Sequence, residues 1–189
     1  MTQPSPSPTT PVVVIDLQTG MFDGAAMPPL HGADALVARV RAVTGWARRT
    51  GRKVAFIRHD GLPGEALTPG AAGWPVWPAL GQAPDEPTFQ KSVGDSFSQP
   101  AFVDWVAAQG AGEVILMGAQ TDECVAATVK GALSRGLKVT VVGDAHSTWP
   151  WNGESAEQII ARHNAAFAEA GAQVVSAEAL IQDEDPLRE

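Results

Sequence analysis

Apolar segments that suit buried strands alternate along this chain with amphipathic segments that suit helices. PVVVIDL (11–17) and KVAFIRH (53–59) are largely apolar and rich in β-branched residues, as strands covered on both faces are. Between them, residues 32–51 carry apolar side chains at helical spacing and end at Gly51. Strands that alternate with helices pair in parallel through right-handed crossovers. The pattern predicts an α/β fold, a three-layer, doubly wound sandwich around a mainly parallel, six-stranded sheet.

The second half of the chain continues this alternation. EVILMGA (113–119) and KVTVVGD (138–144) predict two more buried strands, and residues 122–136 between them predict a helix. A further helix is expected over 154–171, followed by a last strand at 172–177. No internal repeat interrupts the pattern.

One domain accounts for the length of 189 residues. We expect it to span residues 11–182, after a disordered, Pro/Ser/Thr-rich lead-in at 1–10 and before an acidic tail at 183–189. Residues 60–100 are rich in proline and glycine and predict a long irregular insertion. Loops of that length are uncommon unless they are functional, so we expect this one to pack over the sheet edge where ligands bind.

Composition argues against several classes of partner. The net charge is −8 and the lysines and arginines are scattered, whereas a nucleic-acid site needs clustered basic residues. No apolar run approaches the roughly 20 residues that span a bilayer, and the N-terminus lacks the basic and apolar regions of a signal peptide. A single cysteine fits a reducing compartment, so a cytoplasmic location is expected.

Three residues could meet at the carboxyl edge of the predicted sheet, where open parallel sheets bind their ligands. Asp16 ends the first strand, and Cys124, the only cysteine, follows the strand that comes after the insertion. Lys91 is the only lysine or arginine between Arg58 and Lys130. A helix N-terminus and a nearby cation lower the pKa of a thiol from about 8.5. We therefore expect Asp16 to act as a base, with Lys91 beside it stabilising a Cys124 thiolate.

These residues lie in segments that resemble the isochorismatase-like cysteine hydrolases. The similar segments are VVVIDLQTGMF, FQKSVGDSF and GAQTDECVAATVKGALSRGLKVTVVGDAHST, and the resemblance runs from about Val12 to the last strand. It implies the Rossmann-like topology of that family and a catalytic triad of Asp16, Lys91 and Cys124. LTPGAAGWPVWPAL and GAQTDECV most resemble the branch that includes streptothricin hydrolase, a cyclic-amide hydrolase.

The resemblance also implies a mechanism. A cis peptide bond is expected between Ala119 and Gln120, with the backbone N–H groups of Gln120 and Cys124 forming an oxyanion hole. The substrate would be a small molecule whose amide, lactam or carbamoyl C–N bond is cleaved through a cysteine thioester. The alternatives are an ether or ester hydrolase of the isochorismatase type and a catalytically silent binding protein. Family members are commonly homodimers or larger oligomers, which we expect here.

Two rival interpretations involve a metal ion. A phosphatase of the haloacid-dehalogenase kind also starts from a strand that ends in Asp, but it needs a second Asp where this chain has Gln18. Nicotinamidases of the resembled family bind a divalent ion through Asp and His after the second strand. Here His59 and Asp60 are adjacent, and neighbouring strand residues point to opposite faces. We predict no metal and no other cofactor.

The remaining predictions concern the wall of the site. Phe22, Trp74 and Trp149 follow predicted strands or lie in the insertion, so each could contact the substrate. Tryptophans at such positions are also common in cores and interfaces. For Cys124 the competing interpretation is an inert buried thiol, the commoner state of a lone cysteine.

Overall fold

A computed structural model describes residues 6–182 of the chain. Its centre is one six-stranded sheet in the order β3-β2-β1-β4-β5-β6, and all of the neighbouring pairs are parallel. The strands are β1 (Val12–Ile15), β2 (Val54–His59), β3 (Thr88–Lys91), β4 (Glu113–Ala119), β5 (Lys138–Ser147) and β6 (Gln173–Val175). The predicted doubly wound, parallel sheet is confirmed.

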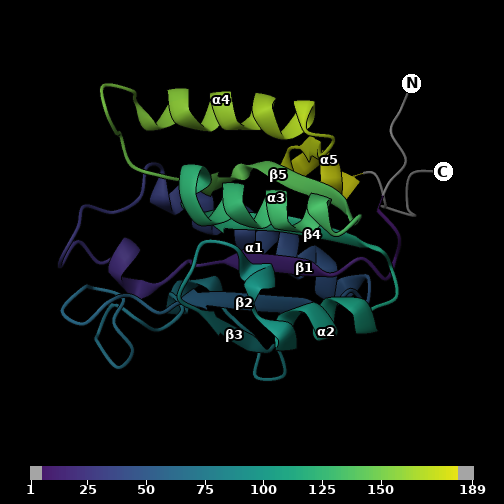
Figure 1. The fold of residues 1–189 in the computed structure, drawn as a ribbon, viewed down its shortest axis with the longest axis horizontal. Helices are drawn as coiled ribbons and strands as arrows, with labels where there is room; N and C mark the ends of the chain where they lie inside the picture. The colour runs from purple at the N-terminus through teal and green to yellow at the C-terminus, as the bar shows by residue number, and fades with distance from the viewer. Residues whose placement is uncertain (1–5, 183–189) are drawn as a thin grey trace.

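Five α-helices cover the two faces of the sheet within the described residues (Figure 1). They are α1 (Ala33–Arg49), α2 (Pro100–Ala108), α3 (Ala126–Ser134), α4 (Ala156–Glu169) and α5 (Ala177–Gln182). Side chains of α1 and α5 pack in one core with alternate residues of β1, and side chains of α2, α3 and α4 pack in a second core with the other residues of β1. Because both faces are covered, all four residues of β1 are buried and apolar.

The order of the strands reverses between β1 and β4, which lie side by side in the middle of the sheet. Ile15 at the end of β1 pairs with Gly118 of β4. Gly118 has a φ of 137°, and a Cβ atom there would collide with the carbonyl oxygen of Ile15. Glycine therefore permits the close approach of the two strands just where their carboxyl ends open the crevice.

The prediction that residues 60–100 are irregular is wrong in part. This segment holds β3 and two short 3₁₀ helices, η2 (Pro78–Leu80) and η3 (Ser96–Ser98). A strand of only four residues inside a Pro/Gly-rich stretch gives too short a pattern to be recognised. The buried side chain of Gln18 holds the segment at Trp74, because its Nε2 donates to the carbonyl of Trp74 at 2.8 Å and to that of His59 in β2 at 3.0 Å.

Several helical boundaries also differ from the prediction. The helix expected at 122–136 begins with a π-helical turn, η4 (Thr121–Val125), and α3 ends at Ser134. A 3₁₀ turn, η1 (Thr19–Met21), follows β1. The sequence analysis did not identify α2 or α5.

The disordered lead-in predicted at 1–10 is wrong for residues 6–10. Thr10 is buried, and its Oγ1 donates to Oε2 of Glu113 at 2.8 Å, while the Ser7 N–H donates to the same oxygen at 2.9 Å. These bonds fix the chain before β1 against the start of β4. Residues 1–5 and the predicted acidic tail at 183–189 lie outside the described residues. Across residues 6–182, the helices are too short or too polar to cross a bilayer.

Candidate active site

The three predicted site residues lie at the carboxyl ends of three strands. Asp16 directly follows β1 and Lys91 is the last residue of β3, and both are buried. Asp16 has a φ of 50°, a left-handed conformation that Asp adopts more readily than most residues. Cys124 lies in the π-helical turn that links β4 to α3 and is half-buried.

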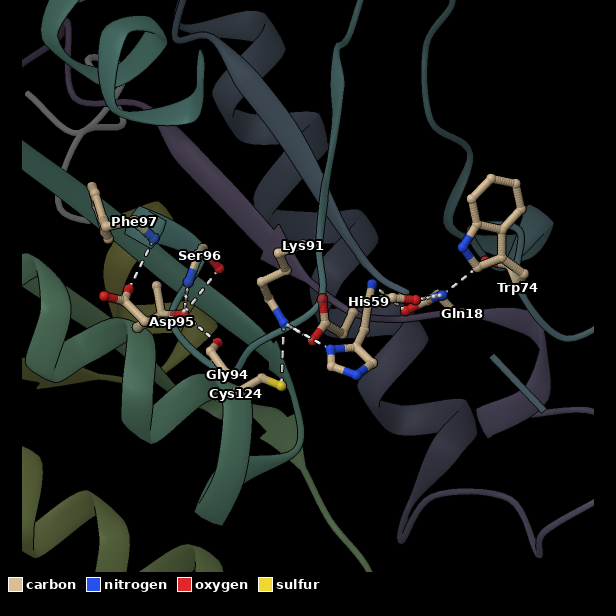
Figure 2. Close-up of polar contacts among 11 residues, drawn as sticks. Gln18, His59, Trp74, Lys91, Gly94, Asp95, Ser96, Phe97 and Cys124 are labelled. Carbon is tan, nitrogen blue, oxygen red and sulfur yellow. Dashed lines mark hydrogen bonds and ion pairs between the residues drawn. The ribbon is translucent and has the colours of Figure 1, made fainter. Parts of the chain in front are cut away.

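Figure 2 shows the ammonium group of Lys91 lying between Sγ of Cys124 and the imidazole of His59, and the same group bonds to Asp16. Its Nζ lies 2.7 Å from Oδ2 of Asp16 and 3.3 Å from Sγ of Cys124. The imidazole Nδ1 of His59, at the end of β2, lies 3.4 Å from the same nitrogen. The Asp16 and Lys91 side chains are 0% exposed, so the ion pair has low-dielectric surroundings that strengthen it.

The thiol of Cys124 is neutral in this arrangement. Burial raises its pKa to about 12, the Asp16 carboxylate adds to the rise, and the Lys91 ammonium offsets only part of it. The expectation of a lowered thiol pKa was therefore wrong, because Lys91 is already paired with a carboxylate that disfavours a second anion. A nucleophile in this state needs a base that removes its proton as it attacks.

Asp16 has an oxygen available for that proton. Oδ2 is bonded to Lys91, whereas the buried Oδ1 has no hydrogen-bond partner among residues 6–182. A carboxylate oxygen of Asp16 lies within 4.8 Å of Sγ of Cys124, so Asp16 is placed where it could accept the proton of the thiol.

The same geometry bears on metal binding. Ligand atoms of Asp16, His59 and Cys124 lie within 4.8 Å of one another, a spacing that could hold a metal ion. However, Lys91 Nζ lies within 3.4 Å of each of the three side chains, so a cation already occupies the middle of the group. A divalent ion there would be repelled by the ammonium. These residues fit an ammonium group and do not fit an added metal.

The loop before Cys124 begins with an unusual peptide bond. The peptide bond between Ala119 and Gln120 is cis, and Gln120 and Cys124 both line the same cavity. The neighbouring Thr121 is completely buried, and its Oγ1 lies 2.8 Å from Nδ1 of His146. This contact ties the loop to the end of β5.

His146 continues this contact into a hydrogen-bond chain. Its Nε2 lies 2.8 Å from Oδ1 of Asn164, whose Nδ2 donates to the carbonyl of Gly143 at 2.8 Å. The imidazole therefore donates from Nε2 and accepts the Thr121 hydroxyl proton at Nδ1. Burial lowers the pKa of His146 from 6.5 to about 4, so the ring is neutral at physiological pH.

Acid should destabilise the protein through this histidine. Since the folded pKa of His146 is depressed from 6.5 to about 4, its contribution is complete above pH 6.5 and is lost as the pH falls toward 4. We expect His146 alone to remove about 2–3 kcal/mol of unfolding free energy between pH 7 and pH 4.5. Urea unfolding of wild type and His146→Gln at both pH values measures this. An equal loss in the two proteins would contradict it.

A cavity of about 830 Å³ opens above the thiol. Its walls come from His59 and Gln120 and from residues 27–28, 92–94, 122–124 and 148–151. The ends of β2, β3, β4 and β5 thus all contribute. The wall at 92–94 is fixed against α3, because the N–H and the hydroxyl of Ser96 both bond to Oγ1 of Thr128, at 3.1 and 2.9 Å.

Of the three predicted wall residues, only Trp149 lines this cavity. Its Nε1 donates to the carbonyl of Pro28 at 2.7 Å, which fixes the ring at the cavity wall. Trp74 does not line it: its ring packs against Arg58, whose guanidinium carbon lies 3.5 Å from the ring centroid. The indole N–H of Trp74 donates to Asp60, so this tryptophan fixes the insertion rather than the substrate.

Phe22 is also outside this cavity. It stacks on Trp77 with ring centroids 5.3 Å apart, on the α1 side of the sheet. After Asp16 the chain continues through Leu17 and Gln18 into η1, and Phe22 follows η1 on the side of the sheet that α1 covers.

Four titratable or aromatic residues that line the cavity were not predicted from the sequence. They are His59, Asp122, Glu123 and Trp151. Asp122 and Glu123 stand in the TDECV block itself, so their proximity to Cys124 was available as a signal. His59 was dismissed as a metal ligand and not considered as a neighbour of Lys91.

Comparisons with known proteins agree with this geometry. The family model described as isochorismatase domain matches residues 10–179. Two proteins of Streptomyces noursei named streptothricin hydrolase are each 31% identical to this chain, over 138 and 152 residues. These matches cover 73% and 79% of the chain, but the chain spans only 49% and 60% of the length of those relatives.

Solved structures give the same picture of the fold. The crystal structure of a candidate isochorismatase hydrolase from Oleispira antarctica is similar with a TM-score of 0.83 and 26% identity. The similarity covers 96% of this chain and 99% of that one.

Proposed function

The chain belongs to the isochorismatase family of hydrolases, and from that premise we propose that it cleaves a C–N bond of a small amide, lactam or carbamoyl compound with Cys124 as nucleophile. One observation carries the proposal. At the floor of a cavity, the ammonium of Lys91 contacts both the carboxylate of Asp16 and the thiol of Cys124. A pure binding protein has no use for a buried base beside a buried thiol.

Acylation begins from a neutral thiol. Oδ1 of Asp16 takes the proton as Sγ of Cys124 forms a bond to the carbonyl carbon, and the carbonyl oxygen becomes an oxyanion. The N–H groups of Gln120 and Cys124 stabilise that oxyanion. When the C–N bond breaks, protonated Asp16 gives its proton to the leaving nitrogen. The products are a free amine and a thioester on Cys124.

Deacylation uses the same groups. Asp16 takes a proton from a water molecule as the water oxygen attacks the thioester carbon. The C–S bond then breaks, the proton returns from Asp16 to the sulfur, and a carboxylic acid leaves. Lys91 keeps its proton throughout and balances the negative charge, which lies on Asp16 at rest and on the oxyanion during each addition step.

The relatives favour this chemistry over the alternative of ether hydrolysis. Streptothricin hydrolase is the name of the two Streptomyces noursei proteins, and a cysteine lies at the required place in this chain. Hydrolysis of a vinyl ether of the isochorismate type needs no acyl-enzyme, and a silent binder needs no turnover. The single cysteine also fits a cytoplasmic location, which we propose. We further propose that the protein is a homodimer or a larger homo-oligomer.

The test is a covalent intermediate on the only cysteine. We expect incubation with a panel of small amides, lactams and ureas to release amine or ammonia and, after rapid acid quenching, to leave an acyl adduct in the intact mass. Cys124→Ala should form no adduct. Turnover of vinyl ethers without an adduct would support the ether alternative, and binding of a panel compound without turnover would support the silent one.

A further inference from the structure

The cavity over Cys124 has a definite electrostatic character. Asp122 and Glu123 line it, and no lysine or arginine does in the part of the chain described. The buried Lys91 beneath it is neutralised by Asp16 at 2.7 Å. The lining therefore carries two carboxylates and no fixed basic group except the imidazole of His59.

The two carboxylates are placed differently. Oδ1 of Asp122 accepts a 2.6 Å hydrogen bond from Oγ1 of the buried Thr148, so this carboxylate is fixed at the wall between η4 and the end of β5. Glu123 is exposed and lies beside the nucleophile in sequence. Arg162 also acts on Asp122 electrostatically, but it is already bonded twice to Glu154, at 3.1 and 2.8 Å.

Two indole rings complete the lining. Trp149 is fixed through its N–H to Pro28, and Trp151 is 75% exposed at the edge of the cavity. Reciprocal backbone hydrogen bonds with Glu154, at 3.0 and 2.9 Å, hold Trp151 in a tight turn. Each cation–aromatic contact seen within residues 6–182 involves a different ring, so these two faces are not covered by a cation of the protein.

We propose that the substrate carries a positively charged group, an ammonium or a guanidinium, next to the bond that is cleaved. Carboxylates attract such a group by charge, and the face of an indole attracts it through its quadrupole. An anionic substrate would meet two carboxylates, and among the described lining residues only the imidazole of His59 could offset them. The identity of the cleaved bond rests on the proposed function, whereas the charge preference rests on the lining alone.

The single cysteine permits a test that needs no substrate. The trimethylammonioethyl and sulfonatoethyl methanethiosulfonates are close in size and opposite in charge, and both form a disulfide with Cys124. For Cys124, the rate constant with the cationic reagent is divided by that with the anionic reagent. This value is then divided by the same quotient for free mercaptoethanol, which gives a charge-preference ratio that equals one when the protein has no preference. We expect the cationic reagent to be favoured about ten-fold or more at low ionic strength, and less as salt is added.

Variants identify the source of the preference. Glu123→Gln and Asp122→Asn should each reduce it, and the double variant should bring it close to one. Trp151→Leu should reduce it at high salt, where indole contact persists. Glu169→Gln on α4, outside the cavity, makes the same change in net charge and should leave the ratio unchanged.

A normalised ratio near one or a preference for the anionic reagent would overturn the charge assignment. So would an effect of Glu169→Gln equal to that of Glu123→Gln or Asp122→Asn. None of these outcomes depends on turnover. An acyl adduct together with a ratio near one would thus reject the cationic substrate and keep the hydrolase. A strong preference for the cationic reagent without any acyl adduct would keep the charge assignment and reject the cysteine hydrolase.

Discussion

Asp16→Asn is expected to abolish most hydrolysis and, at the same time, to make Cys124 more acidic. The first effect follows from the loss of the base: general acid–base groups contribute about 10²–10⁴-fold to rate, and Asp16 serves twice in each turnover. The second follows from charge, since the carboxylate raises the pKa of the Cys124 thiol and Lys91 would then be left to stabilise a thiolate. A variant with lower activity and a lower thiol pKa has lost its base, whereas a damaged fold would lower the activity without making the thiol more acidic.

Two measurements check this prediction. The rate of alkylation of Cys124 by iodoacetamide, followed from pH 6 to pH 11, shows whether the thiol pKa has fallen below the wild-type value of about 12, and kcat/KM on the best panel substrate reports hydrolysis. Asp60→Asn is a matched control, because its carboxylate bonds to Trp74 and lies outside the cavity. If Asp16→Asn left kcat/KM unchanged, or raised the thiol pKa, Asp16 would not be the base.

The raised thiol pKa changes how the site is understood. Many catalytic cysteines are thiolates at rest, stabilised by a cation that has no other partner. Here the cation is already bonded to the Asp16 carboxylate, and the pKa of the Cys124 thiol is raised to about 12.

Much of the fold could be predicted because its signals are long and repeated. The all-buried segment of β1, the helical spacing of α1 and the strand β4 are each recognisable alone. β3 and α2 were not recognised. β3 is four residues with only Lys91 fully buried, and α2 begins directly at a proline after a 3₁₀ turn, so neither shows a clear period before tertiary packing.

Some residues of the candidate site could also be predicted from the sequence, and others could not. Asp16, Lys91 and Cys124 could be predicted because strand ends meet at one edge, and the structure places them in contact. The orientation of rings at the ends of loops could not, because it depends on contacts between distant segments. Trp74 is held by Arg58, whereas Trp149 is held by Pro28, and only the second arrangement faces the cavity.

Lys91→Met is expected to lower the unfolding free energy by about 3–5 kcal/mol. The side chains of Lys91 and Asp16 are both 0% exposed. Removing one partner of a buried ion pair leaves the other charge uncompensated, which typically costs about 3–5 kcal/mol. Methionine keeps most of the volume of lysine, so a cavity does not account for the loss. Lys130→Met on the exposed side of α3 is the matched control and should change stability by less than about 0.5 kcal/mol.

The double variant Asp16→Asn/Lys91→Met shows whether charge is the cause. Asn has no charge to leave unpaired, so the double variant should be more stable than Lys91→Met alone, and a double-mutant cycle from urea unfolding gives the coupling. Additive losses would mean that the pair is held by packing and not by its charges. A large coupling would instead show that Lys91 compensates the buried base, which is the condition for keeping Asp16 as a carboxylate beside a neutral thiol.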